Sequence, residues 1–173
     1  MEFQLSYLSP NGHAKRRAQA IVGILPKDTI TIDLEKDCEL HAETLLLAFE
    51  MNEVSPRAVP YRIAELLSRV EHQKVLLLLT VPFRPNTNIK SRVENWLMPF
   101  LPQTCSYCGL YFCAGQASEG LLRNISLRTE REPYNRRLGQ SLHHCKDSKG
   151  HPNEEDLQQA CCFVKKALGL NLA

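Results

Sequence analysis

The order in which two hydrophobic patterns alternate along the chain restricts the fold more than any other sequence feature. Five short apolar segments are typical of β-strands, because apolar residues alternate along them or run without interruption. They are EFQLSYL (2–8), TITIDL (29–34), TLLLAF (44–49), KVLLLLTV (74–81) and YCGLYFCA (107–114). The last three are continuous, as expected of strands that are buried on both faces of a parallel sheet.

Helical periodicity fills most of the intervals between and after these segments. Apolar residues recur at i, i+4, i+7, i+8 and i+11, or nearly so, in segments 14–25, 59–70, 89–100 and 157–168. Each stripe can pack one helix face on a sheet. Asn153 is suited to cap the last helix, since the three acidic residues after it complement the helix dipole. The alternation predicts a doubly wound α/β domain with a mostly parallel sheet.

One segment resists this interpretation. The chain's 173 residues suit a single domain, but segment 115–152 shows neither the strand pattern nor the helix pattern clearly. We expect a turn of helix near 118–125 and otherwise a long irregular link. A link of this length is usually functional or mobile.

Composition excludes several classes of function. Apolar residues make up 43% and charged residues 23% of the chain, and the net charge is +2. This balance does not favour nucleic-acid binding, and no apolar run approaches the length of a membrane span. The first residues lack the features of a signal peptide. The seven cysteines therefore indicate reduced thiols and a cytoplasmic protein.

The turn after the first strand carries the strongest functional signal. It reads SPNGHAKRR (9–17) and leads directly into a helical pattern. Free N–H groups at a helix N-terminus favour an anion, Gly12 permits a tight turn, and Ser9 and Asn11 can add side-chain donors. The three cations at 15–17 raise the local positive potential. The spacing matches neither the Walker pattern nor G-x-G-x-x-G. An ordinary helix start with surface cations is the alternative.

This turn resembles the phosphate loop of flavodoxins, which reads roughly S-x-T-G-N-T-[KR]-x-x-A. Ser9, Gly12, Lys15 and Ala18 match, whereas Asn11, His13 and Ala14 stand where the family has threonine, asparagine and threonine. Segments 44–83, 109–118 and 151–168 are similar to later parts of the same family, in the same order. The resemblance therefore covers most of the chain.

The resemblance implies a flavodoxin-like five-stranded parallel sheet of order 2-1-3-4-5 with helices on both faces, and non-covalent binding of FMN. The phosphate would lie on 9–14 and the ring between loops 50–57 and 80–88, with the turn at 113–118 closing the pocket. Phe83 is the best candidate to stack on the ring. The expected cofactor-binding residues are Ser9, Asn11, Gly12, His13, Ala14, Lys15, Asn52, Thr80, Pro82, Phe83 and Asn88.

The resemblance implies an electron-transfer protein that serves a redox partner protein, or the flavin subunit of a reductase. Glu50 and Glu53 would lie near the ring and lower its reduction potential. Classical flavodoxins are acidic and carry two flanking aromatic residues, whereas this chain is slightly basic and has Phe83 alone. These departures favour a second interpretation, in which the fold has lost flavin and recognises a partner through the arginine-rich segment 120–137.

The cysteines suggest other chemistries that the spacing supports poorly. Cys105 and Cys108 form a C-x-x-C that precedes a strand, whereas a thioredoxin-type pair opens a helix. Zinc would need a second half-site such as 143–145, and this spacing matches no common zinc pattern. Cys113 fits a buried strand residue better than a nucleophile. We find no Ser/His/Asp or Cys/His arrangement that supports a hydrolase or a transferase.

Overall fold

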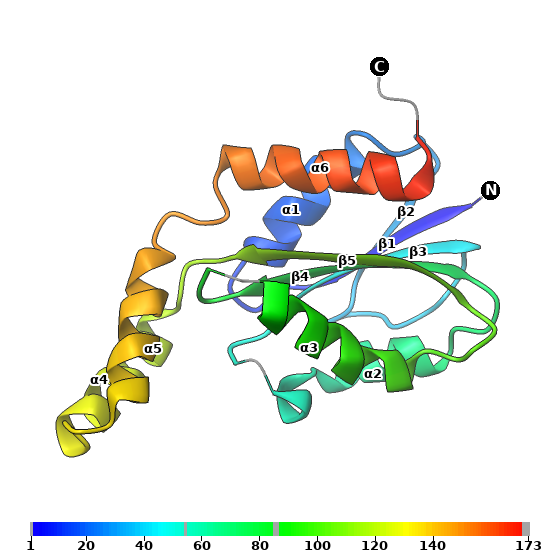
Figure 1. Ribbon diagram of the computed structural model, residues 1–173. Helices are drawn as coiled ribbons and strands as arrows, with labels where there is room; N and C mark the ends of the chain where they lie inside the picture. The colour runs from blue at the N-terminus through cyan, green and yellow to red at the C-terminus, as the bar shows by residue number, and fades with distance from the viewer. Residues whose placement is uncertain (1, 54, 85–86, 171–173) are drawn as a thin grey trace.

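The described residues of the computed structural model, 2–53, 55–84 and 87–170, form one parallel sheet between two helical layers (Figure 1). The strands are β1 (Phe3–Leu8), β2 (Ile30–Asp33), β3 (Thr44–Glu50), β4 (Lys74–Val81) and β5 (Ser106–Ala114). Their order is β2-β1-β3-β4-β5, and each neighbouring pair is parallel. The expected strands and strand order are confirmed.

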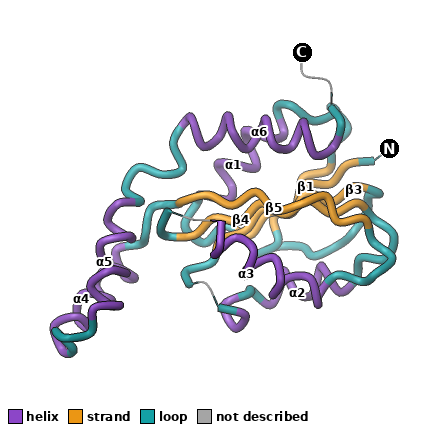
Figure 2. The backbone as a smooth tube through the Cα atoms, viewed as in Figure 1, coloured by secondary structure: helices purple, strands orange, loops and turns teal. Residues whose placement is uncertain are grey.

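Helices cover both faces of the sheet, which explains the continuous apolar runs (Figure 2). The helices are α1 (His13–Val22), α2 (Tyr61–Ser68), α3 (Thr87–Leu97), α4 (Glu119–Arg131), α5 (Arg136–Asp147) and α6 (Glu154–Leu168). Leu46 and Leu76 belong to the core under α1 and α6, whereas Leu45 and Leu77 belong to the core under α2 and α3. Successive side chains of one strand thus enter opposite cores.

Segment 115–152 is helical, not irregular as the sequence suggested. Helices α4 and α5 form a hairpin that extends from the carboxyl-terminal edge of the sheet (Figure 1). Ser118 caps α4 by accepting a hydrogen bond from the N–H of Leu121. Ser148, which is fully buried, follows α5, and its hydroxyl lies 2.7 Å from the carbonyl of Cys145 and 3.2 Å from the carbonyl of Pro82, just after β4. The hairpin is therefore fixed to the same edge at which β4 ends.

Helix α6 has the capping arrangement that the sequence predicted. The side chain of Asn153 accepts from the N–H of Asp156, and the Asp156 carboxylate accepts from the N–H of Asn153. The hydroxyl of Tyr111 on β5 donates to the carbonyl of Asp156. The start of α6 is thus held against the last strand. None of the helices within the described residues combines the length and apolar character needed to cross a membrane.

We expect Asn153→Ala to lower the free energy of unfolding by about 1 kcal/mol, because the substitution removes the cap of α6. Chemical denaturation measures this change. Gln158→Ala on the exposed face of the same helix is the control and should change stability by less than about 0.5 kcal/mol. Equal effects of the two substitutions would contradict the capping role.

Candidate functional site

The turn between β1 and α1 has the backbone form expected of an anion-binding loop. Gly12 precedes the first residue of α1 with a φ of 85°, a left-handed conformation that glycine adopts without strain. The N–H of Gly12 donates to the carbonyl of Ser9, which closes the turn. The first N–H groups of the helix are left without backbone acceptors and need another partner.

That partner is the carboxylate of Glu50, the last residue of β3. Its Oε1 accepts from the Ser9 hydroxyl at 2.6 Å and from the N–H of Ala14 at 2.8 Å, and its Oε2 accepts from the N–H of Asn11 at 3.1 Å. The Ser9 oxygen in turn accepts from the N–H of Lys15 at 2.9 Å. Glu50 is only 6% exposed. A buried carboxylate thus occupies the centre of the turn.

Glu50 is therefore not placed where the sequence suggested. We expected it beside a flavin ring, but it lies in the turn that was expected to hold phosphate. The donors of the turn do suit an anion, since the helix dipole and converging N–H groups favour negative charge. As the chain stands, its own carboxylate satisfies these donors, and a phosphate fits the turn only if Glu50 leaves.

The three cations at the start of α1 have different environments. Lys15 is exposed. Arg16 donates to the carbonyl of Pro152 at 2.9 Å and to the carboxylate of Glu154 at 2.7 Å. Arg17 is fully buried, so it does not act at the surface of the turn as we expected. Lys15 and Arg16 are thus exposed to solution, whereas Arg17 is not.

Arg17 crosses beneath the ends of β4 and β5. It donates to the carbonyls of Leu78 and Leu79, to the Thr80 hydroxyl and to the Cys113 sulfur. Helical periodicity contained this signal, because residue 17 follows Ala14 by three positions and precedes Ile21 by four, on the buried face of α1.

A small cavity next to Glu50 brings several expected site residues together. Its volume is about 10 Å³, roughly the space of one water molecule. It is lined by Asn11, His13, Glu50, Met51, Asn52, Thr80, Val81, Pro82, Gly115 and Gln116. His13 donates from Nε2 to the carbonyl of Gln116 at 2.9 Å, across the cavity. The turn at 113–118 therefore contacts the start of α1.

A larger pocket of about 460 Å³ lies between the loops after β3 and β4 and the α4–α5 hairpin; below, it is called the hairpin pocket. Its lining residues are Asn52, Glu53, Phe83, Ile89, Leu121, Asn124, Ile125, Arg128, Leu138, Ser141, His144 and Cys145. Phe83 and Asn52 were expected at the flavin ring, and both line this pocket. Asn88 is exposed and lines neither the small cavity nor the hairpin pocket.

The sequence did not indicate that the α4–α5 hairpin forms one wall of the hairpin pocket. Leu121 and Ile125 are four residues apart on α4, and Leu138 and Cys145 are seven apart on α5. This helical spacing was present in the sequence, but the polar residues around it hid the pattern.

The cysteines do not form a reactive or metal-binding group in the described residues. Burial raises the pKa of the Cys105 and Cys108 thiols, which opposes thiolate formation. Burial likewise raises the pKa of Cys113, a buried strand residue that is hydrogen-bonded to Arg17. Cys108 lies near the amino end of β5, whereas residues 143–145 lie on α5, beyond the carboxyl ends of the strands (Figure 1).

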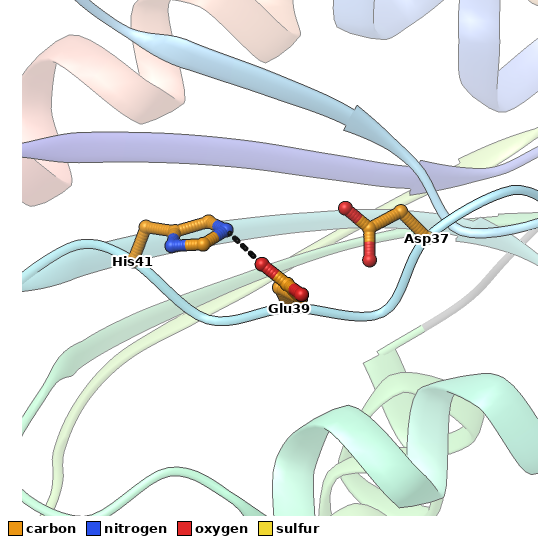
Figure 3. A group of neighbouring side chains, drawn as sticks. All are labelled: Asp37, Glu39 and His41. Atoms are coloured by element: carbon orange, nitrogen blue, oxygen red, sulfur yellow. Dashed lines mark ion pairs between the residues drawn. The ribbon is translucent and has the colours of Figure 1, made fainter.

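Asp37, Glu39 and His41 are the one set of three potential metal ligands that lie close together in the described part of the chain (Figure 3). All three are exposed, and His41 lies 2.9 Å from the carboxylate of Glu39. This ion pair explains why His41 and Glu39 lie close together without a metal. The group lies on the link between β2 and β3, and none of its members lines the small cavity or the hairpin pocket.

The close packing around the small cavity predicts a steric effect at Gly115. A Cβ atom there would overlap the methyl group of Thr80 and approach Cδ2 of His13 within 3.1 Å. We expect Gly115→Ala to lower the free energy of unfolding by about 1–3 kcal/mol. Gly139→Ala on α5 meets no atom within 4 Å and should instead raise stability by up to about 1 kcal/mol. Thermal unfolding distinguishes these signs, and a neutral Gly115→Ala would contradict the packing.

Comparisons with known proteins agree with this architecture. The model of the flavodoxin domain family matches residues 4–165. A flavodoxin-like domain-containing protein of Clostridioides difficile, BilS, is 20% identical over 170 residues, which is 97% of each chain. The flavodoxin of Streptococcus pneumoniae has a similar structure, with a TM-score of 0.56, 10% identity and coverage of 98% of this chain and 99% of its own. Flavodoxin 1 of Bacillus cereus gives a TM-score of 0.57, 10% identity and 98% coverage of both chains. The chain belongs to the flavodoxin domain family.

Proposed function

We propose that this chain binds FMN at the carboxyl-terminal edge of its sheet and exchanges electrons with a partner protein. One observation carries the proposal: an anion-binding turn and an apolar pocket lie side by side at this edge. Asn52 lines both the small cavity beside the turn and the hairpin pocket. An anionic group joined to a flat apolar ring system, as in FMN, has both features that such a pair of sites recognises.

The hairpin pocket suits the ring system in size and chemistry. Its volume of about 460 Å³ lies in the ordinary range of small-molecule sites. Phe83 offers an aromatic face for stacking, and Ile125 and Leu138 offer apolar contacts from the hairpin. Asn52 and His144 offer polar groups that can fix the orientation of a bound ring.

The hydrogen-bond donors of the turn suit a phosphate, but the Glu50 carboxylate already occupies the turn. Ser9, Asn11 and Ala14 present hydrogen-bond donors that converge on one point, and this point is negatively charged by Glu50. Binding of the phosphate therefore requires that Glu50 turn away, whereas binding of the ring does not.

The flavin and the protein then have the separate roles that are usual in flavoproteins. The flavin supplies the one- and two-electron redox steps, and the chain supplies binding, orientation and electrostatics. Residues of the hairpin shield one side of the pocket from water. A free electron carrier and the flavin subunit of a reductase both agree with this arrangement.

A second candidate function is partner recognition without flavin. The observation that favours it is that Glu50 already satisfies the turn. The hairpin also exposes basic residues, namely Arg123, Arg128, Arg131, Arg136 and Arg137. Tyr134 at the tip of the hairpin is 96% exposed. Such a surface would suit an acidic protein partner.

Titration with flavin separates the two candidates. We expect the purified protein to quench the fluorescence of added FMN and to shift its visible absorbance bands. Phe83→Ala should weaken the affinity about threefold to tenfold, because it removes one stacking face. Tyr61→Ala is the matched control, since Tyr61 is an exposed aromatic residue that does not line the hairpin pocket. If FMN, FAD and riboflavin all fail to bind, partner recognition replaces the flavin proposal.

A further inference from the structure

We infer that the Glu50 carboxylate competes with the phosphate group of FMN for the turn between β1 and α1. This protein then binds FMN as an exchangeable ligand, chiefly through the flavin ring. The inference rests on the flavin binding proposed above and concerns the selectivity of the same site. It makes Glu50 the residue that decides whether the phosphate of FMN adds to the affinity.

The contacts of Glu50 are those of an anion in a built site. Its two oxygens accept from Ser9, Asn11 and Ala14 at 2.6–3.1 Å. Hydrogen bonds to an ionised carboxylate are stronger than those between neutral groups. The side chain is also 6% exposed and lies at the end of a central strand. It therefore holds the turn without any ligand.

Carboxylate and phosphate cannot occupy the turn together. The adjoining cavity of about 10 Å³ has room for roughly one water molecule and not for a phosphate. Both groups are anions and would use the same donors. Arg17 is buried and donates to the carbonyls of Leu78 and Leu79, so it does not neutralise a second negative charge in the turn.

The space that Glu50 would enter on leaving is unfavourable for its charge. Glu50 also lines a third pocket, of about 490 Å³, together with Glu35 and Glu53. Like charges raise the free energy of a carboxylate placed there. The displaced state is therefore a minor one, and the affinity for a phosphate falls by the fraction of molecules that adopt it. Riboflavin, which has no phosphate, escapes this penalty.

The experiment compares FMN with riboflavin on the wild-type protein, Glu50→Ala and Glu50→Gln. We expect the wild-type protein to bind the two flavins with affinities within about threefold of each other. Glu50→Ala should bind FMN at least about tenfold more tightly, and its riboflavin affinity should change by less than about threefold. Glu50→Gln removes the charge but keeps the shape, and should give an intermediate gain.

The control for net charge is Glu43→Gln. Glu43 is exposed and precedes β3 at its opposite end, so the substitution changes the charge equally but far from the turn. We expect no change in the ratio of FMN to riboflavin affinity. Circular dichroism checks that each variant is folded, and Glu50→Gln serves as the test variant if Glu50→Ala does not fold.

A second arm needs no flavin. Inorganic phosphate is added while the backbone amide signals of Asn11 and Ala14 are followed by nuclear magnetic resonance. We expect both signals to move in Glu50→Ala and to stay unchanged in the wild-type protein at the same phosphate concentration. This readout reports the occupancy of the turn directly.

The outcomes separate the inference from the proposed function. The inference is overturned if the wild-type protein binds FMN more than about a hundredfold more tightly than riboflavin and the Glu50 variants leave that ratio unchanged. It is also overturned if phosphate moves the wild-type amide signals. If no flavin binds any variant but phosphate enters the turn of Glu50→Ala, the competition stands and the flavin function fails.

Discussion

The hydrogen bonds between Glu50 and the turn after β1 connect the parts on which the rest of the site depends. They join the carboxyl end of β3 to the first turn of α1, at the position where the strand order reverses. Ligands of doubly wound sheets bind in the crevice at this point. Here the chain places one of its own carboxylates in the crevice, so the nearest charged partner of the turn is internal.

Arg17 explains why the turn is held in a defined position. A buried cation is tolerated only when its N–H groups are hydrogen-bonded. The two terminal nitrogens of Arg17 meet this condition with the carbonyls of Leu78 and Leu79 and with Thr80 and Cys113, whereas its Nε has no hydrogen-bond partner within the described residues. Helix α1 is thereby fixed across β4 and β5, and its N-terminus is fixed with it. The hairpin is fixed separately, through Ser148 and the carbonyl of Pro82.

The sequence predicted the sheet well because its signals there are strong. The continuous apolar runs at 44–49 and 74–81 are typical of strands covered on both faces, and the two cores confirm this. The hairpin was missed because helices α4 and α5 are mostly exposed, and their few apolar residues serve a pocket rather than the core. A weak periodicity of this kind is difficult to distinguish from a solvated link.

The sequence indicated where the candidate site lies but not that Glu50 occupies the turn. The turn, Phe83 and Asn52 were identified from local patterns and a family resemblance. The role of Glu50 depends on a contact between residues about forty positions apart, and no local pattern carries it. Arg17 illustrates the same limit. A run of three cations indicates a basic surface, whereas the helical period sends one of them into the core.

The most direct test of the account is a crystal structure of the wild-type protein grown with excess FMN. The account predicts the ring in the hairpin pocket. Wherever the phosphate reaches the donors of Ser9 and Ala14, Glu50 must have turned out of the turn. A structure in which Glu50 keeps its hydrogen bond to Ala14 while a phosphate also contacts that turn would contradict the central claim that the turn holds one anion at a time.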